Sequence, residues 1–112
     1  MHLAPAARFR AVPAGADYLP GDFAHDGFIH CTREPEVLLE VANAFYRDAP
    51  GEMLVLVIDP ARVRAEVRFE AAAHPRGPDD PLFPHIYGPL NTDAIVAVRP
   101  AVRAIDGAYL AV

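Results

Sequence analysis

The sequence predicts an α+β domain in which a mainly antiparallel sheet packs against a few helices. Residues 53–58 (MLVLVI) are continuously apolar and rich in β-branched side chains, as expected of a central strand buried on both faces. Residues 66–71 (EVRFEA) alternate between apolar and charged, which is typical of a half-buried strand. The chain has 112 residues, of which 53% are hydrophobic. These numbers suit a single domain, residues 1–112, around one core.

The clearest helix is predicted at residues 34–48, after the segment DGFIHCT. Leu38, Val41 and Phe45 recur there at helical spacing, with polar side chains on the other sides. Thr32 is the expected N-cap, and Pro35 falls in the first turn, where a missing backbone N–H does no harm.

Proline divides the rest of the chain into short elements. The 12 prolines are about double the usual ~5% frequency, and each fixes the local φ angle and removes a backbone donor. Before the helix, the sequence predicts a short edge strand at 1–4, a brief helix at 5–12, a loop at 13–26 and a short strand at 27–31. After the two strands at 53–58 and 66–71, it predicts a proline-rich loop at 72–82, a strand at 94–100 and a short closing strand at 108–112.

The charge distribution does not favour a nucleic-acid partner. The formal net charge is −5, and the 10 basic residues are all arginines scattered along the chain. A protein that follows a phosphate backbone needs a dense basic patch, so we expect none here, although one or two arginines can still form a local anion site.

The chain is expected to work in the cytoplasm. Cys31 is the only cysteine, so an internal disulfide cannot form and a reducing compartment fits. No signal peptide is evident at the N-terminus, and no apolar run approaches the ~20 residues that a membrane-spanning helix requires.

The segment DGFIHCT predicts a histidine that points away from the core. Side chains on a strand alternate between two faces, so Ile29 and Cys31 share one face while Phe28, His30 and Thr32 share the other. The apolar pair is the natural core face, which leaves His30 displayed beside an aromatic ring and a hydroxyl group.

The segment FPHIYGPL repeats this grouping. The same alternation places Phe83, His85 and Tyr87 on one face and turns Pro84 and Ile86 the other way. Each segment therefore offers an aromatic ring, an imidazole and a hydroxyl group on a single face, which indicates a candidate site.

Structural roles are the alternative to functional ones for these side chains. A strand histidine often makes one hydrogen bond and does no chemistry, Tyr87 can be a half-buried phenol, and Thr32 can be a helix cap only. Glu70 is the candidate carboxylate, although a solvated strand end explains it equally well. His2, His25 and His74 lie at the terminus or in predicted loops, and we expect them to be exposed.

Other chemistries fit the sequence less well. A zinc site needs three or four ligands in close pairs, and neither C-x-x-C nor H-x-x-x-H occurs, so no metal site is predicted. A Cys31–His85 nucleophilic pair conflicts with the alternation that turns the thiol toward the core. The glycines are isolated from one another, so the chain has no glycine-rich phosphate loop.

Four segments, DGFIHCT, VLLEVANAFY, MLVLVID and FPHIYGPLNTDAIVAV, together resemble a small bacterial family of unknown function, DUF952. The resemblance spans residues 26–98. It departs from the family pattern at the N-terminus, where the opening strand is a residue or two shorter and Phe9 stands where the family usually has tryptophan.

The resemblance implies a fold similar to that of the ADP-ribosyltransferases. The chain is also distantly similar to the RNA 2′-phosphotransferases, which use NAD on that fold. Those enzymes have, in the same order, a strand that ends like IHCT, a helix, and a strand like LVLVID. On this analogy His30 and Thr32 match positions that face the NAD cleft. The arginines with which those enzymes bind phosphate have no matching residue in this chain.

These expectations define a leading hypothesis and an alternative. The first is an enzyme that acts on a nucleotide-type small molecule, with NAD as the cofactor implied by resemblance. Phe28 or Phe83 would stack on a ring, His30 and Thr32 would bind ribose or phosphate, and Glu70 would stabilise positive charge. His85 would be the general acid–base, because imidazole exchanges protons near neutral pH. The alternative is a non-catalytic module that binds a nucleotide or a protein.

Overall fold

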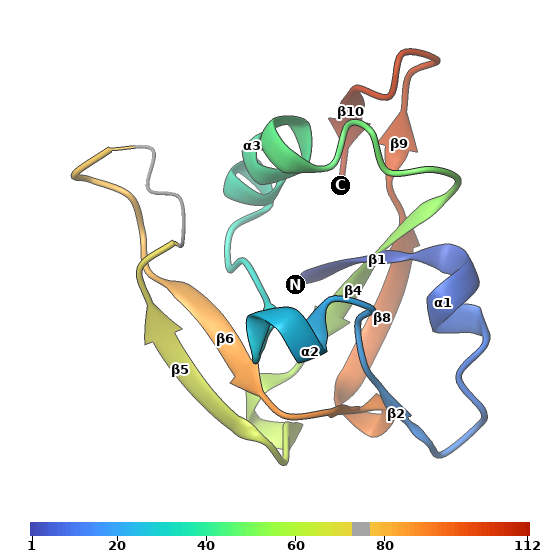
Figure 1. Ribbon diagram of the computed structural model, residues 1–112, viewed down its shortest axis with the longest axis vertical. Coiled ribbons are helices and arrows are strands. Elements are labelled where there is room, and N and C mark those ends of the chain that lie inside the picture. Colours follow the sequence, from blue (N-terminus) through green and yellow to red (C-terminus); the bar gives the residue numbers. More distant parts are fainter. Residues whose placement is uncertain (73–76) are drawn as a thin grey trace.

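The computed structural model describes residues 1–72 and 77–112 and confirms the α+β class with antiparallel sheets. The first sheet has the strand order β1-β4-β8, formed by β1 (His2–Pro5), β4 (Met53–Ile58) and β8 (Ile95–Pro100). The second has the order β3-β6-β5, formed by β3 (Ile29–His30), β6 (Phe83–Tyr87) and β5 (Glu66–Glu70), and lies at the left of Figure 1.

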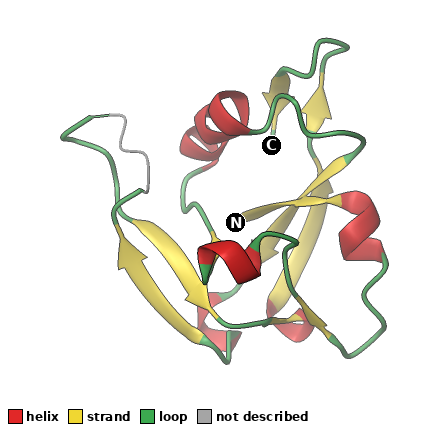
Figure 2. Cartoon of the chain, in the orientation of Figure 1, coloured by secondary structure: helices red, strands yellow, loops and turns green. Residues whose placement is uncertain are grey.

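Two short strand pairs and a few helices complete the described part of the chain (Figure 2). The pairs are β2 (Asp17–Tyr18) with β7 (Leu90–Asn91), and β9 (Val102–Arg103) with β10 (Tyr109–Ala111). The helices are α1 (Ala6–Arg10), α2 (Phe23–Asp26) and α3 (Pro35–Phe45), with 3₁₀ turns η1 (Pro60–Arg62) and η2 (Thr92–Ala94).

Strand β4 is the central strand that the sequence predicts, and it serves two hydrophobic clusters. Leu54 and Leu56 belong to one cluster, whereas Met53 and Val55 belong to the other. This division follows from the alternation of side chains along an extended strand. The edge position of β1, beside β4, is also confirmed.

Helix α3 is shorter than predicted, and its cap differs. It begins at Pro35 with Glu34 as the N-cap, so the expected capping role of Thr32 is wrong. It ends at Phe45 rather than residue 48, and the residues that follow make tertiary contacts instead. The carbonyl of Tyr46 accepts from the Tyr109 hydroxyl, and that of Arg47 accepts from Arg103.

The predicted loop at 13–26 is wrong in part, since it contains β2 and α2. Strand β2 exists because Asp17 and Tyr18 pair with distant residues of β7, which no local pattern indicates. Helix α2 ends at Asp26 and is capped by Gly27, whose φ of 81° is the left-handed conformation that glycine adopts most readily at a helix C-terminus. Strand β9 was also not predicted, whereas β10 matches the expected closing strand. The expected loop at 72–82 falls partly outside the described residues.

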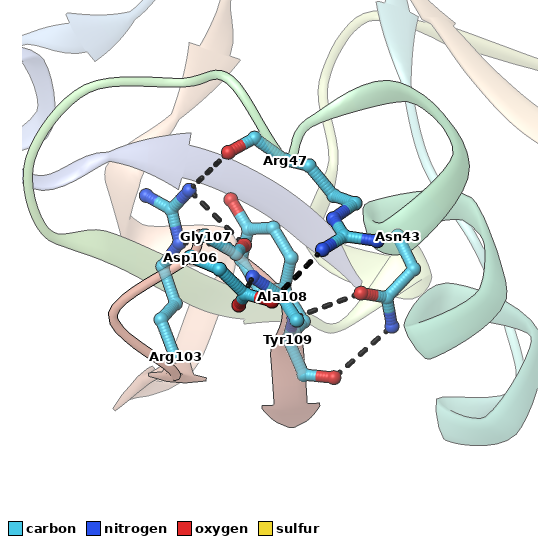
Figure 3. Close-up of polar contacts among 7 residues, drawn as sticks. All are labelled: Asn43, Arg47, Arg103, Asp106, Gly107, Ala108 and Tyr109. Carbon is cyan, nitrogen blue, oxygen red and sulfur yellow. Dashed lines mark hydrogen bonds and ion pairs between the residues drawn. The ribbon is translucent and has the colours of Figure 1, made fainter.

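A polar clamp holds the β9–β10 hairpin against α3 and the chain that follows it (Figure 3). The guanidinium of Arg103 donates to the carbonyls of Ala49, Gly51 and Arg47 at 2.7 to 2.9 Å. The amide of Asn43 bonds both backbone groups of Tyr109, at 2.8 and 3.0 Å. The clamp fixes the C-terminal segment against α3, whose buried Leu38 and Ala42 share a hydrophobic cluster with Tyr109 and with Val55 of the first sheet.

Candidate functional site

A pocket of about 360 Å³ lies on one face of the β3-β6-β5 sheet. Helices α2 and α3 form its other walls, and its lining is mixed, with aromatic, imidazole and carboxylate groups. The lining residues are Asp22, Asp26, His30, Cys31, Thr32, Val41, Phe45, Tyr46, Ala72, Phe83 and His85.

The two histidines singled out by the sequence lie side by side in this pocket. Strands β3 and β6 pair in a register that sets His30 opposite His85 and Ile29 opposite Ile86. The imidazole centroids are 5.6 Å apart, whereas Ile29 and Ile86 are buried in the core on the other face. The predicted alternation of faces is therefore confirmed in both segments.

His85 is held by a carboxylate that it shares with Tyr87. Nδ1 of His85 lies 2.9 Å from Oε1 of Glu70, and the hydroxyl of Tyr87 donates to the same oxygen. Because a carboxylate only accepts, Nδ1 of His85 carries a proton, and in the neutral ring Nε2 keeps its lone pair. Strand β5 supplies Glu70 from the neighbouring edge, opposite Phe83 in register.

The two hydrogen bonds shift the acidity of this group. The Tyr87 hydroxyl, followed by His85, lowers the pKa of Glu70, and the Glu70 carboxylate in turn raises the pKa of Tyr87. Glu70 therefore stays ionised and Tyr87 stays protonated near neutral pH. The guanidinium of Arg68 lies 4.3 Å from the Tyr87 ring centroid and adds positive charge beside this chain.

His30 has a carboxylate of its own. Nε2 of His30 lies 3.0 Å from Oδ2 of Asp26, at the C-terminal end of α2. Asp26 also bonds His25, and hydrogen bonds from His25 and then His30 lower the pKa of Asp26. Each site imidazole is thus oriented by an acceptor that is ionised near neutral pH.

Phe28 joins the two imidazoles into one aromatic cluster. Its ring stacks on His85 with centroids 4.1 Å apart and planes 20° apart, and its centroid lies 4.6 Å from that of His30. Tyr87 is also close, at 5.3 Å between centroids. Stacking on one side of His85 restricts the orientation of the ring in the pocket.

The remaining predicted site residues are more enclosed than expected. Thr32 is buried, and its backbone N–H donates to the carbonyl of Met1 at 2.8 Å. Phe83 is buried as well, and both residues line the pocket. Of the predicted site residues, four line the pocket: His30, Thr32, Phe83 and His85. Phe28 and Glu70 contact His85 instead, and Tyr87 bonds Glu70.

Sequence reasoning missed two acidic residues and misjudged a histidine. Asp22 and Asp26 line the pocket, and the only signal for Asp26 was its place four residues before His30. His2 is buried rather than exposed, because β1 brings its ring under β3, where Nδ1 donates to the His30 carbonyl at 2.7 Å. His25 is exposed as expected, and His74 lies outside the described residues.

Cys31 does not join the polar cluster. It belongs to the hydrophobic core, and burial raises the pKa of its thiol to about 11, so the thiol stays protonated. This argues against the Cys31–His85 pair as a nucleophile and base. Within residues 1–72 and 77–112, no group of three or more His, Cys, Asp or Glu is placed to hold a metal ion.

Together, the fold and the site define a small α+β protein with a pocket built from two histidine–carboxylate pairs. The chain belongs to the family described as protein of unknown function (DUF952), whose model matches residues 3–98. It is similar in fold to CC0527 from Caulobacter crescentus, whose crystal structure aligns with a TM-score of 0.76 and 21% identity over 96% of this chain and 89% of that chain.

A double mutant of CC0527 aligns over the same shares of the two chains, with a TM-score of 0.75. No curated protein matches the sequence. In the described part of the chain, no helix is both long and apolar enough to cross a membrane.

Proposed function

We propose that this protein is a cytoplasmic enzyme that acts on a nucleotide-type small molecule, with NAD as the candidate cofactor. One observation carries the proposal: His30 and His85 face the same pocket, 5.6 Å apart, and each is bonded to a carboxylate. Titratable groups with defined partners in a pocket are typical of catalytic sites.

In this proposal His85 is the general acid–base. Glu70 holds the proton on Nδ1, so Nε2 is the nitrogen that exchanges a proton with the substrate. Glu70 is a positioning residue for His85, as the carboxylate of a histidine–carboxylate pair is in other enzymes. The Tyr87 hydroxyl keeps Glu70 ionised, and Phe28 fixes the plane of the His85 ring.

The pocket suits the part of a nucleotide that carries positive charge. Asp22 and Asp26 line it, aromatic rings of Phe45 and Phe83 face it, and none of its described lining residues is an arginine. When bound, NAD supplies a ribosyl carbon that gains positive charge as nicotinamide leaves. His30 would bind a ribose hydroxyl, Thr32 would border the same subsite, and the carboxylates would stabilise the positive charge. Phe83 would stack on a ring.

The choice of NAD rests on the resemblance of short sequence segments to the ADP-ribosyltransferases and RNA 2′-phosphotransferases. Fold does not settle function, so the chemistry must be tested directly.

The test incubates wild-type protein and three variants with NAD and measures the released nicotinamide by chromatography. Wild type is expected to release nicotinamide, and His85→Asn and Glu70→Gln are expected to lower the rate at least ~100-fold, the usual contribution of a positioned acid–base. Glu52→Gln, which removes an exposed partner of Arg10, is the matched control and keeps the wild-type rate.

A binding module is the second candidate, favoured by the burial of His85, whose side chain is only 5% exposed. A raised thermal midpoint with NAD but no nicotinamide release would support this module. Absence of both responses would contradict the enzyme proposal.

If His30→Ala and His85→Ala both unfold the protein, the histidines have a structural role instead. A site selected for chemistry is expected to leave the melting temperature unchanged or higher when either histidine is removed.

A further inference from the structure

A second concave surface lies on the opposite face of the β3-β6-β5 sheet. Strands β5 and β6 pair Phe69 with Pro84 and Val67 with Ile86, and these side chains face away from Glu70 and His85. They form the floor of a cavity of about 360 Å³, which we call the Arg33 groove.

The opposite wall of the Arg33 groove is also apolar. It comes from the end of β4 and the turn that follows it, through Ile58, Pro60 and Val63. Ile58, Val63 and Val67 are only partly buried against the core. The volume and the apolar lining are in the range of small-molecule sites, which add a few polar groups that set the orientation of the ligand.

The polar group of this groove is the guanidinium of Arg33. Arg33 follows β3, at one edge of the sheet, and its Cζ lies 5.7 Å from the ring centroid of Phe69, which belongs to β5 at the other edge. The guanidinium therefore reaches across β6 and closes one end of the groove, held by a cation–π contact.

The charge of Arg33 is not balanced by an ion pair within the described part of the chain. Arg10, Arg64 and Arg68 each form an ion pair, whereas Arg33 has no carboxylate within ion-pair distance among the described residues. The chain as a whole has a formal charge of −5, yet this guanidinium borders an apolar cavity. The guanidinium of Arg99 adds positive charge nearby, 3.6 Å from the sulfur of Met1, which also lines the groove.

We propose that the Arg33 groove binds a small amphipathic anion. Its apolar body would lie against Val67 and Ile86, and its carboxylate or phosphate group would bond to Arg33, whose planar fork matches either group. The Arg33 groove lies on the opposite face of the sheet from His30 and His85, and the two cavities share Cys31 and Thr32 in their lining. The existence of the groove does not depend on the proposed enzymatic function.

The test uses sodium octanoate as the probe, with methyl-labelled isoleucine and valine observed by NMR. Octanoate is expected to shift the methyl signals of Ile58, Val63, Val67 and Ile86. Octanol and octylammonium, which share the chain but lack the negative charge, are expected to bind at least ~10-fold more weakly, since a hydrogen bond to a charged group contributes that much or more.

Two variants assign the binding to the groove. Arg33→Gln changes an exposed side chain, and it is expected to weaken octanoate to the affinity of octanol. Val67→Trp fills the floor and is expected to abolish the shifts while Arg33 remains. Arg47→Gln, which removes a remote exposed pair with Asp106, is the control and keeps wild-type binding. No methyl shifts at millimolar octanoate, or shifts that Arg33→Gln leaves unchanged, would overturn the proposal.

Discussion

At the scale of single residues, the four histidines in the described part of the chain have four different environments. His2 is buried under β3, His25 is exposed, His30 bonds Asp26, and His85 bonds Glu70. The side chain is the same in each case, so the partner and the exposure decide which ring nitrogen carries a proton. The orientation of the two imidazoles in the pocket is therefore set by Asp26 and Glu70.

Removing the Glu70 carboxylate is expected to lower the pKa of Tyr87. The hydrogen bond that the Tyr87 hydroxyl donates to Glu70 is the main cause of the raised pKa, because it stabilises the protonated phenol. In Glu70→Gln this pKa should fall toward the ordinary value of 10.0. The measurement is a pH titration of phenolate absorbance, from which the same titration of the Tyr87→Phe variant is subtracted to remove the signal of the other tyrosines. Glu52→Gln is the control, and an unchanged Tyr87 titration in Glu70→Gln would disprove the shared hydrogen bond.

His2 makes the stability of the protein depend on pH. Burial lowers the pKa of His2 from 6.5 to about 4, although its bond to the His30 carbonyl and the charge of Asp22 oppose this. The unfolded chain therefore takes up a proton first, so this contribution to stability is complete above pH ~6.5 and is lost as pH falls toward 4. The loss is on the order of 3 kcal/mol.

The measurement for His2 is chemical denaturation between pH 4 and 7. His2→Gln is expected to be less stable than wild type at neutral pH and to show a flatter dependence on pH across this window. A slope as steep as that of wild type would show that another group is responsible. His25→Gln, at an exposed position, is the matched control, and its stability should still fall as the pH is lowered.

At the scale of elements, the C-terminal hairpin depends on a close approach between two chain segments. A Cβ at Gly107 would lie 2.3 Å from the carbonyl oxygen of Arg47, and the φ angle of Gly107 is 91°. Gly51 has a similar φ of 78° but no atom within 4 Å of such a Cβ. A side chain at either position would therefore strain the backbone, but only at Gly107 would it also collide with a neighbouring atom.

Gly107→Ala is expected to destabilise the protein more than Gly51→Ala. Both pay the left-handed backbone cost of about 1 kcal/mol, and only Gly107→Ala also displaces the Arg47 carbonyl from Arg103. Denaturant unfolding of the two variants should differ by at least ~1 kcal/mol. Equal losses would show that the hairpin can move away from Arg47 without penalty.

At the scale of the whole molecule, β4 couples the two hydrophobic clusters. Leu56 packs with Ile29 and Ile86 below the site, whereas Val55 packs with Leu38 of α3. A single strand thus joins the sheet that carries the histidines to the helix that walls the pocket. Loss of one cluster should remove support from the other.

Leu56→Ala is therefore expected to lower the stability of the entire domain by about 2–5 kcal/mol, the usual cost for a fully buried leucine. Unfolding should remain one cooperative transition when followed by tyrosine fluorescence and by circular dichroism. Val98→Ala, at an exposed position of β8, should change stability far less. Two separate transitions in Leu56→Ala would mean that the clusters unfold independently.

The sequence by itself determined which faces its strands present. Alternation along an extended chain is a local property, so the placing of Ile29 in the core and of His30 and His85 away from it could be derived from spacing. The continuous apolar run of β4 likewise identified the central strand. Short segments of the sequence also indicated the family to which the chain belongs.

Only the tertiary structure decided what these faces meet. The partnership of His30 with Asp26 needs α2, and that of His85 with Glu70 needs the register of β5 on β6. The burial of His2 needs β1 to pass beneath β3. Such pairings join segments far apart in the chain, and their free energy comes from the whole packed core, so no local pattern of residues specifies them.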